Sequence, residues 1–147
     1  MFLDHDGPAV IAGDRTLTYA DLRAAPPPPG DPAEVIGANT PEFVLGLFGA
    51  WNAGATAVPL NVRLRGYELE RIRSNLNGVR PRSGSTILYT SGSTGDPKGA
   101  YLTREGAAHW ARTLAGVLEL EPEDRVGVII PMSHAFGLAT LLSTLLL

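Results

Sequence analysis

The sequence predicts an α/β fold in which a mostly parallel β-sheet is flanked by helices. Short apolar segments that favour strands, at residues 34–38, 55–60 and 87–89, alternate with longer segments whose apolar residues recur at helical spacing. Alternating strands and helices are typical of parallel sheets, because the chain must cross over the sheet between parallel strands. At 147 residues the chain is long enough for one domain with a buried core.

The N-terminal segment predicts a hairpin, a short helix and a rigid connector. Residues 9–12 and 15–18 are expected to pair as two short strands joined by a Gly-Asp turn. Thr18 is then placed to cap a helix over residues 19–25, since its hydroxyl can accept a free backbone N–H. The proline run at residues 26–29 ends that helix and predicts a stiff, exposed connector.

Two further helices are predicted in the middle of the chain. Thr40 is expected to cap the first, with proline at its first helical position and Gly54 at its end. Its apolar residues fall on one face and predict ordinary core: Phe43, Val44, Leu47, Phe48 and Trp51. Residues 67–76 predict a charged helix with a narrow apolar stripe, whose arginines we interpret as a solvated face.

The C-terminal third predicts a helix capped by Thr103, an acidic turn at residues 119–124 and a buried strand at residues 126–130. From Ala135 onward the chain is expected to be helical. Its apolar end, up to Leu147, has no cap, charge or glycine stop. We therefore expect an exposed apolar surface through which the isolated chain associates with itself or with a complementary chain.

Composition and charge exclude several classes of function. The formal charge is −3 without a basic run, so nothing indicates a nucleic-acid partner. The chain has no cysteine, which excludes disulfide and thiol chemistry and agrees with a cytoplasmic location. The N-terminus carries acids where a signal peptide would be basic, and the apolar C-terminal stretch is too short to span a bilayer.

The most informative segment is residues 87–99, ILYTSGSTGDPKG, which contains Lys98, the only lysine of the chain. An apolar strand leads into a turn rich in glycines and hydroxyl side chains. Glycines let the backbone approach a ligand closely, and successive N–H groups in such a turn form an anion-binding concavity. The segment therefore predicts a phosphate-binding loop rather than an unliganded surface loop. It is not a Walker loop, because Pro97 and Gly99 replace the required glycine and hydroxyl residue.

The stretch YTSGSTGDPKG resembles the signature loop of the adenylate-forming enzymes, which include acyl-CoA synthetases and the adenylation domains of peptide synthetases. Residues 15–22, 39–61 and 131–138 are similar to other stretches of this family, in the expected order. The resemblance implies the N-terminal domain of an ATP-dependent carboxylate-activating ligase. Such an enzyme forms an acyl-adenylate and then transfers the acyl group to the thiol of CoA or of a carrier protein.

The resemblance also implies roles for single residues. Lys98 matches the lysine that reaches the β- and γ-phosphates of ATP, and His134 matches a histidine beside the acyl carboxylate. For His134, the residues alone leave a structural histidine as the alternative. The loop residues expected to hold the ATP phosphates are Thr90, Ser91, Gly92, Ser93, Thr94 and Gly95. Magnesium is implied together with ATP, but no ligand for it can be identified. Asp96 is expected to face away from the phosphates, because its charge would repel them.

The resemblance covers only the first part of the family's length. The downstream adenine and ribose segments and the C-terminal domain with its catalytic lysine have no counterpart here. About 27 residues separate Asn61 from Tyr89, where the family usually inserts a further strand and helix. We expect residues 1–147 to be a truncated AMP-binding domain that is inactive alone. The alternative is a non-catalytic remnant or interaction module that retains the phosphate loop; the failed Walker spacing disfavours a phosphate-loop kinase or GTPase.

Overall fold

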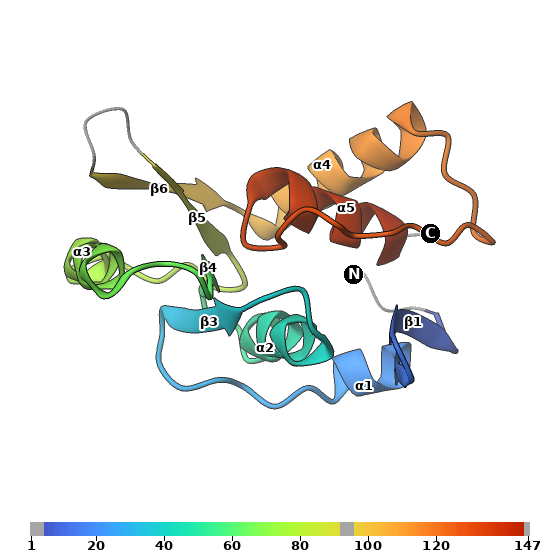
Figure 1. Ribbon diagram of the computed structural model, residues 1–147, viewed down its shortest axis with the longest axis horizontal. Helices are drawn as coiled ribbons and strands as arrows, with labels where there is room; N and C mark the ends of the chain where they lie inside the picture. The colour runs from blue at the N-terminus through green and yellow to red at the C-terminus, as the bar shows by residue number, and fades with distance from the viewer. Residues whose placement is uncertain (1–4, 92–95, 146–147) are drawn as a thin grey trace.

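The computed structural model describes residues 5–91 and 96–145. Within these ranges, strands and helices alternate along the chain around a four-stranded sheet and a separate two-stranded hairpin (Figure 1). In chain order the elements are β1 (Pro8–Ala12), β2 (Arg15–Thr18), α1 (Tyr19–Arg23), β3 (Ala33–Gly37), α2 (Pro41–Asn52), β4 (Ala57–Asn61), α3 (Gly66–Leu76), β5 (Thr86–Ser91), β6 (Pro97–Leu102), α4 (Arg104–Val117) and α5 (Ala135–Leu145). The expected α/β fold class is confirmed, and the predicted element boundaries mostly shift by one or two residues.

The main sheet has the strand order β3-β4-β5-β6, and two of its three pairings are parallel. β3 and β4 pair along their whole length, whereas β4 and β5 meet only where Ala57 lies opposite Thr86. β5 and β6 form an antiparallel hairpin that extends away from the rest of the sheet (Figure 1). The mostly parallel sheet is therefore confirmed, and the segment with the predicted phosphate loop lies at its antiparallel edge.

The N-terminal hairpin and helix follow the sequence prediction closely. β1 pairs with β2, and Thr18 caps α1. The Asp21 N–H donates to the Thr18 hydroxyl at 3.2 Å, and the Thr18 N–H donates to the Asp21 carboxylate at 2.7 Å. Hydrogen bonds from the Thr18 side chain and backbone hold the pKa of Asp21 below its ordinary value. α1 ends at Arg23, two residues before the predicted end.

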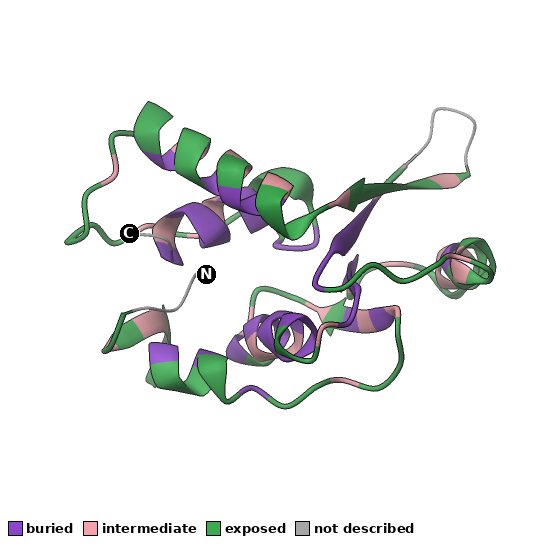
Figure 2. Cartoon of the chain, turned by 180° about the vertical axis from the view of Figure 1, so that it is seen from behind, coloured by how far each residue is buried: buried purple, intermediate pink, exposed green. Residues whose placement is uncertain are grey.

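Helix α2 supplies much of the core. Its five predicted core residues are all buried, and its predicted cap is present, since the Phe43 N–H donates to the Thr40 hydroxyl at 3.3 Å. The Trp51 indole meets the Phe48 ring edge-on, at 5.2 Å between centroids, and donates to the Thr86 hydroxyl at 3.2 Å. Burial of each such side chain stabilises the fold by about 1.5–3 kcal/mol. In Figure 2 the buried residues concentrate on α2 and α5, which face the middle of the molecule.

The predicted strand at residues 126–130 is wrong. This segment lies in no strand, and its Ile129 side chain is 91% exposed. The side chain of Asn39 donates to the carbonyls of Val128 and Ile130, both at 2.9 Å. An apolar β-branched run favours extended backbone, but a strand also needs a neighbouring strand for its ladder. In the described parts of the chain, the side-chain amide of Asn39 binds these carbonyls, and no neighbouring strand does.

The predicted apolar surface at the C-terminus is also wrong for the residues that the structure describes. α5 packs on α4, and its Leu138, Leu142 and Leu145 side chains are fully buried. The face of α4 toward the core consists of alanines, which let the two helices approach closely. Residues 146 and 147 lie outside the described ranges. Helix α5 therefore packs into the core of the chain, which removes the reason to expect association through its described residues.

Across the described parts of the chain, no helix is both long enough and apolar enough to cross a membrane.

Candidate functional site

The predicted phosphate-loop residues flank the end of the β5–β6 hairpin. Thr90 lies directly opposite Lys98, and the next pair is Ser91 with Pro97. Because directly paired residues of antiparallel strands project from the same face, Thr90 and Lys98 share one face of the hairpin. Both are exposed, while Ile87 lower in β5 is buried at 2% exposure. The hairpin therefore has a buried base and a polar outer end.

Four of the predicted loop residues, Gly92, Ser93, Thr94 and Gly95, lie outside the described residues. Of the predicted phosphate contacts, the structure thus brings together the two flanks, Thr90 with Ser91 on β5 and Lys98 on β6. Lys98 forms no ion pair with any residue that the structure describes. Its ammonium is therefore free of a competing carboxylate in these parts of the chain.

Gly99 allows the two strands to pack at this end of the hairpin. A Cβ atom there would lie 2.9 Å from Cγ2 of Ile87 and 3.1 Å from the ring of Tyr89. Burial raises the pKa of the Tyr89 phenol above its ordinary value, and the nearby Tyr101 adds to this shift. Tyr89 is thus a neutral packing residue at physiological pH, and the glycine next to Lys98 serves strand packing.

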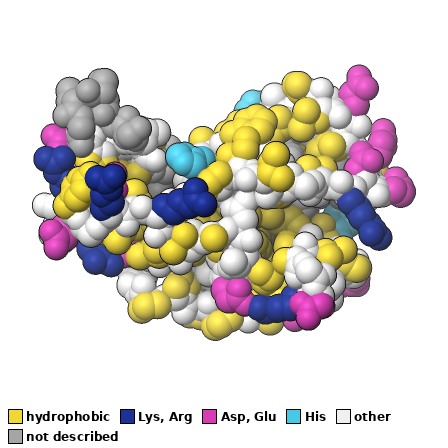
Figure 3. Space-filling model, viewed as in Figure 1, with side chains coloured by type: hydrophobic (Ala, Val, Ile, Leu, Met, Phe, Trp, Pro, Cys, Tyr) yellow, Lys and Arg dark blue, Asp and Glu magenta, His cyan; other side chains and the backbone are white. Residues whose placement is uncertain are grey.

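Helix α3 lies against the start of β6. The Asn75 side chain donates to the carbonyl of Pro97 at 2.9 Å, and the Arg71 guanidinium lies 3.4 Å from the Asp96 carboxylate. Asp96 thus turns toward α3. On the same helix, Arg73 pairs with Glu34 of β3 at 2.8 Å, which raises the pKa of the Arg73 guanidinium. Figure 3 shows these basic and acidic side chains intermixed over α3, beside the hairpin.

The contacts of Arg71 and Asn75 are missing from the sequence prediction, which treats the arginines of this helix as a solvated face. Arg71 is about half exposed, as expected, but it also forms an ion pair. The sequence does contain one signal for this pair of residues. Positions 71 and 75 are four apart and therefore lie on the same helix face. What the sequence does not show is that this face meets the hairpin.

His134 lies immediately before α5, in a turn held by backbone contacts. Its N–H donates to the carbonyl of Pro131, and its own carbonyl accepts the N–H of Leu138, both at 2.9 Å. The His134 side chain is exposed, whereas the neighbouring Ser133 is buried at 8% exposure. The Ser133 hydroxyl finds no hydrogen-bond partner in the described part of the chain.

The position of this turn depends on Gly137 and Asn39. A Cβ atom at Gly137 would lie 2.2 Å from the carbonyl oxygen of Pro131, so the turn rests directly on the backbone of α5. From the other side, the side-chain carbonyl oxygen of Asn39 accepts the N–H of Met132 at 2.8 Å. Gly137 and the Asn39 side chain thus fix the position of the turn that ends at His134, just before α5.

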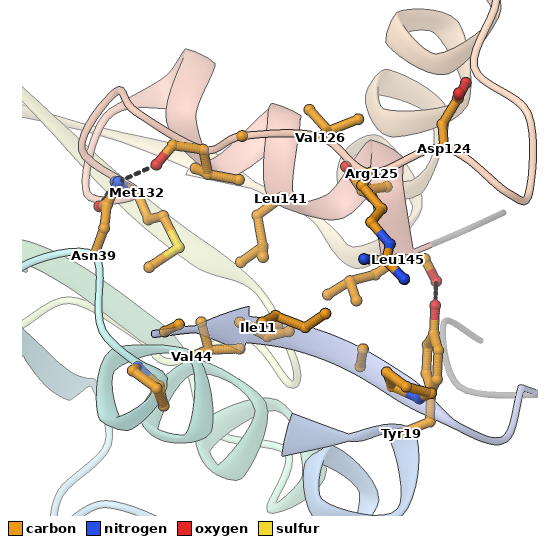
Figure 4. A pocket seen from close by; sticks show the side chains of 18 of the residues that line it. Ile11, Tyr19, Asn39, Val44, Asp124, Arg125, Val126, Met132, Leu141 and Leu145 are labelled. Atoms are coloured by element: carbon orange, nitrogen blue, oxygen red, sulfur yellow. Dashed lines mark hydrogen bonds between the residues drawn. The ribbon is translucent and has the colours of Figure 1, made fainter. Parts of the chain in front are cut away.

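A cavity of about 650 Å³ lies between the N-terminal part of the chain and α5. Figure 4 shows Ile11 and Val44 on one side of it and Leu141 and Leu145 on the other, with the Tyr19 hydroxyl donating to the Leu145 carbonyl. Neither Lys98 nor His134 lines this cavity. Within the described ranges, no hydrogen bond or ion pair joins those two residues to each other. The structure does not bring the two predicted catalytic residues into contact.

No group of three or more histidine, aspartate or glutamate side chains that could hold a metal ion occurs in the parts of the chain that the structure describes. The magnesium ion implied by the resemblance therefore has no protein-only cage in these residues. This fits the chemistry of magnesium, which usually keeps several waters and binds through one or two carboxylates together with substrate phosphates.

Comparison with known proteins finds relatives that are named as CoA synthases or CoA ligases. Feruloyl-CoA synthase of an Amycolatopsis species is 30% identical, over 88% of this chain and 37% of the relative. A long-chain-fatty-acid–CoA ligase of Mycobacterium tuberculosis is 26% identical, over 77% of this chain and 32% of the relative. The chain thus spans only about a third of the length of these curated relatives. The first alignment runs over 181 positions although the whole chain has 147 residues, so the relative carries segments that this chain lacks.

The fold has counterparts among solved structures. The O-succinylbenzoate coenzyme A synthetase of Bacillus subtilis, solved in complex with AMP, superposes with a TM-score of 0.79 at 23% identity. The superposition covers 96% of this chain and 50% of the synthetase chain. At this identity the likeness establishes the fold alone. It places the β5–β6 hairpin and the His134 turn in one known architecture.

A sequence model described as AMP-binding enzyme matches residues 73–147, about half of the chain. The matched part includes the whole β5–β6 hairpin and the His134 turn, the two segments that carry the signature residues. Family match, curated relatives and fold agree, and the chain belongs to the AMP-binding enzyme family.

Proposed function

We propose that this chain supplies the phosphate-binding hairpin of an ATP-dependent carboxylate-activating ligase. The complete enzyme would join a carboxylic acid to AMP with release of pyrophosphate, and would then transfer the acyl group to the thiol of CoA or of a carrier protein. Family membership supports this reaction, and so do relatives that are themselves CoA ligases. The observation that carries the proposal is the exposed pair of Thr90 and Lys98 at the outer end of the hairpin.

In this proposal, Lys98 reaches the β- and γ-phosphates of ATP. Attack of the carboxylate at the α-phosphorus leaves charge on the departing pyrophosphate, and a nearby ammonium stabilises that charge. Lys98 suits this role because it is exposed and has no ion-pair partner among the described residues. The backbone N–H groups and hydroxyls of residues 90–95 would hold the remaining phosphate oxygens. Magnesium, bound together with ATP, would supply further positive charge to stabilise the departing pyrophosphate.

His134 would lie beside the acyl carboxylate, as the resemblance implies. Its exposed side chain at the start of α5 supports this role, since a ligand can reach it. A carboxylate near the N-terminus of a helix is also favoured by the helix dipole. The carboxylic acid itself would contact further residues that the longer relatives contain.

The proposal is tested by changing Lys98 in the present chain. Lys98→Ala should weaken ATP binding about tenfold to a hundredfold, because one charge-assisted contact to phosphate contributes about 1.5–3 kcal/mol. Lys98→Arg should restore binding only in part, since the planar guanidinium does not replace the compact ammonium. Isothermal titration calorimetry measures both affinities.

Arg112→Ala on the exposed face of α4 is the matched control, because it removes a cation far along the chain from the hairpin. It should leave both ATP affinity and melting temperature unchanged. Equal affinity in wild type, Lys98→Ala and Arg112→Ala would contradict the proposal. A large loss of melting temperature in Lys98→Ala would show that the lysine is structural.

A further inference from the structure

One carboxylate lies close to the predicted phosphate site. Asp96 is the only acidic residue between Ile87 and Leu102, and it is two positions from Lys98. Two like charges a short distance apart repel each other even in water, and a polyphosphate carries several charges. An uncompensated Asp96 would therefore oppose the binding of the ligand that Lys98 attracts.

The structure provides a compensating charge from a different element. The Arg71 guanidinium of α3 lies 3.4 Å from the Asp96 carboxylate, with the two side chains 53% and 67% exposed. One helical turn later, Asn75 donates to the carbonyl of Pro97 at 2.9 Å. Asp96, just before β6, and Pro97, the first residue of β6, are thus held by two residues on one face of α3. Helix α3 therefore contacts the hairpin through two residues of one face, and not through a single surface pair.

The contact follows from the connection between β4 and β5. Helix α3 lies in the connection between the two strands and packs against β6 of the hairpin that follows. Its side chains are therefore available to set the charge and position of the hairpin stem.

We propose that Arg71 is a positioning residue of the phosphate site, which neutralises Asp96 and holds it toward α3 while Asn75 fixes the stem at Pro97. This inference rests on the proposed function. Arg71 acts through Asp96 and does not itself contact the phosphates. Its effect on a polyanion is electrostatic, so it depends on the charge of Asp96 and on ionic strength.

The experiment measures the binding of tripolyphosphate, which has the linked phosphates of ATP without its base. Arg71→Gln should weaken this binding about three- to tenfold at low salt, because Asp96 is left uncompensated. Asp96→Asn in the Arg71→Gln background should return the affinity to within about twofold of wild type. Arg71→Lys keeps the charge and should bind like wild type. The loss in Arg71→Gln should shrink at about 1 M salt, where the Debye length falls to about 3 Å.

Arg73→Gln is the matched control. It also removes an arginine–carboxylate pair from α3, but its partner, Glu34, lies on β3, the opposite edge of the sheet from β6. It should leave tripolyphosphate affinity unchanged. The single variant Asp96→Asn leaves α3 unchanged and should bind tripolyphosphate at least as tightly as wild type does. Melting temperatures of all variants show whether a loss of affinity reflects unfolding.

The outcomes separate this inference from the proposed function. Tripolyphosphate binding that is lost in Lys98→Ala but unchanged in Arg71→Gln overturns the inference and leaves the proposed function standing. Weak binding in Arg71→Gln that Asp96→Asn does not restore also overturns it, because Arg71 would then contact the ligand directly. Absence of binding in the wild type overturns the proposed function and the inference with it. Recovery in the double variant supports both.

Discussion

Single residues at the hairpin have two different tasks. Lys98 and Thr90 are exposed and available to a ligand, whereas Gly99 beside them matters for packing. Because Ile87 is buried and branched at Cβ, it has little freedom to move away from a new methyl group. The signature loop therefore contains a glycine whose role is separate from phosphate binding.

Gly99→Ala should destabilise the fold by about 1–3 kcal/mol, the usual cost of an added methyl group in a well-packed place. The new Cβ would lie 2.9 Å from the Ile87 side chain. Chemical denaturation measures the change in unfolding free energy. Gly127→Ala is the control, because a Cβ there meets nothing within 4 Å, and it should change stability by less than about 0.5 kcal/mol. Equal stability of the two variants would show that the hairpin adjusts freely.

Among the elements, α5 shows how a helix can position a turn. Its first turn contains Gly137, whose missing side chain leaves room for the carbonyls of Ile130 and Pro131. The turn that ends at His134 therefore lies in direct contact with the helix backbone. The helix N-terminus and the histidine are placed by the same glycine.

Gly137→Ala should displace this turn, because its Cβ would lie 2.2 Å from one backbone oxygen and 2.6 Å from another. The expected loss of unfolding free energy is about 1–3 kcal/mol, with a shift of the His134 imidazole signals in NMR spectra. Gly116→Ala in α4 is a control for which we expect the opposite change in stability. A Cβ there meets nothing within 4 Å, so the better helix former should stabilise the protein by about 0.5–1 kcal/mol. Two variants that both stabilise would refute the role given to Gly137.

At the scale of the whole molecule, the described residues form a main buried cluster and a smaller second one, and the chain spans only part of its relatives. The main buried cluster joins residues from the N-terminal hairpin, α2, α4 and α5. The two described ends of the chain thus meet in the same core. The chain nevertheless covers only half of the solved synthetase and about a third of the curated relatives.

Residues 1–147 alone should therefore not catalyse carboxylate-dependent exchange of pyrophosphate into ATP. Much of the rate of such a reaction comes from positioning both reactants. The present residues contain no second lysine and no segment that resembles the family's adenine segment. The measurement follows labelled pyrophosphate into ATP in the presence of a panel of aromatic and aliphatic acids. Exchange at a rate ordinary for ligases, above roughly 1 s⁻¹, would contradict this prediction.

The sequence by itself determined the local structure and identified the residues of the candidate site. Helix caps at Thr18, Thr40 and Thr103 are present as predicted, because a cap depends on residues only three positions apart. The parallel strands and the core face of α2 also follow from local periodicity. Lys98 and Thr90 were identified from their motif, and the structure shows them exposed and paired in register. The roles of Lys98 and His134 remain predictions.

Only the tertiary structure decided which segments meet. Residues 126–130 have the composition of a strand but no neighbouring strand to complete a ladder, and the apolar α5 is buried because the alanines of α4 cover it. The contact of Arg71 with Asp96 likewise joins residues 25 positions apart through the packing of α3 on β6. Local sequence determines what an element can bury or bind. The partner that it finds depends on the packing of the whole chain.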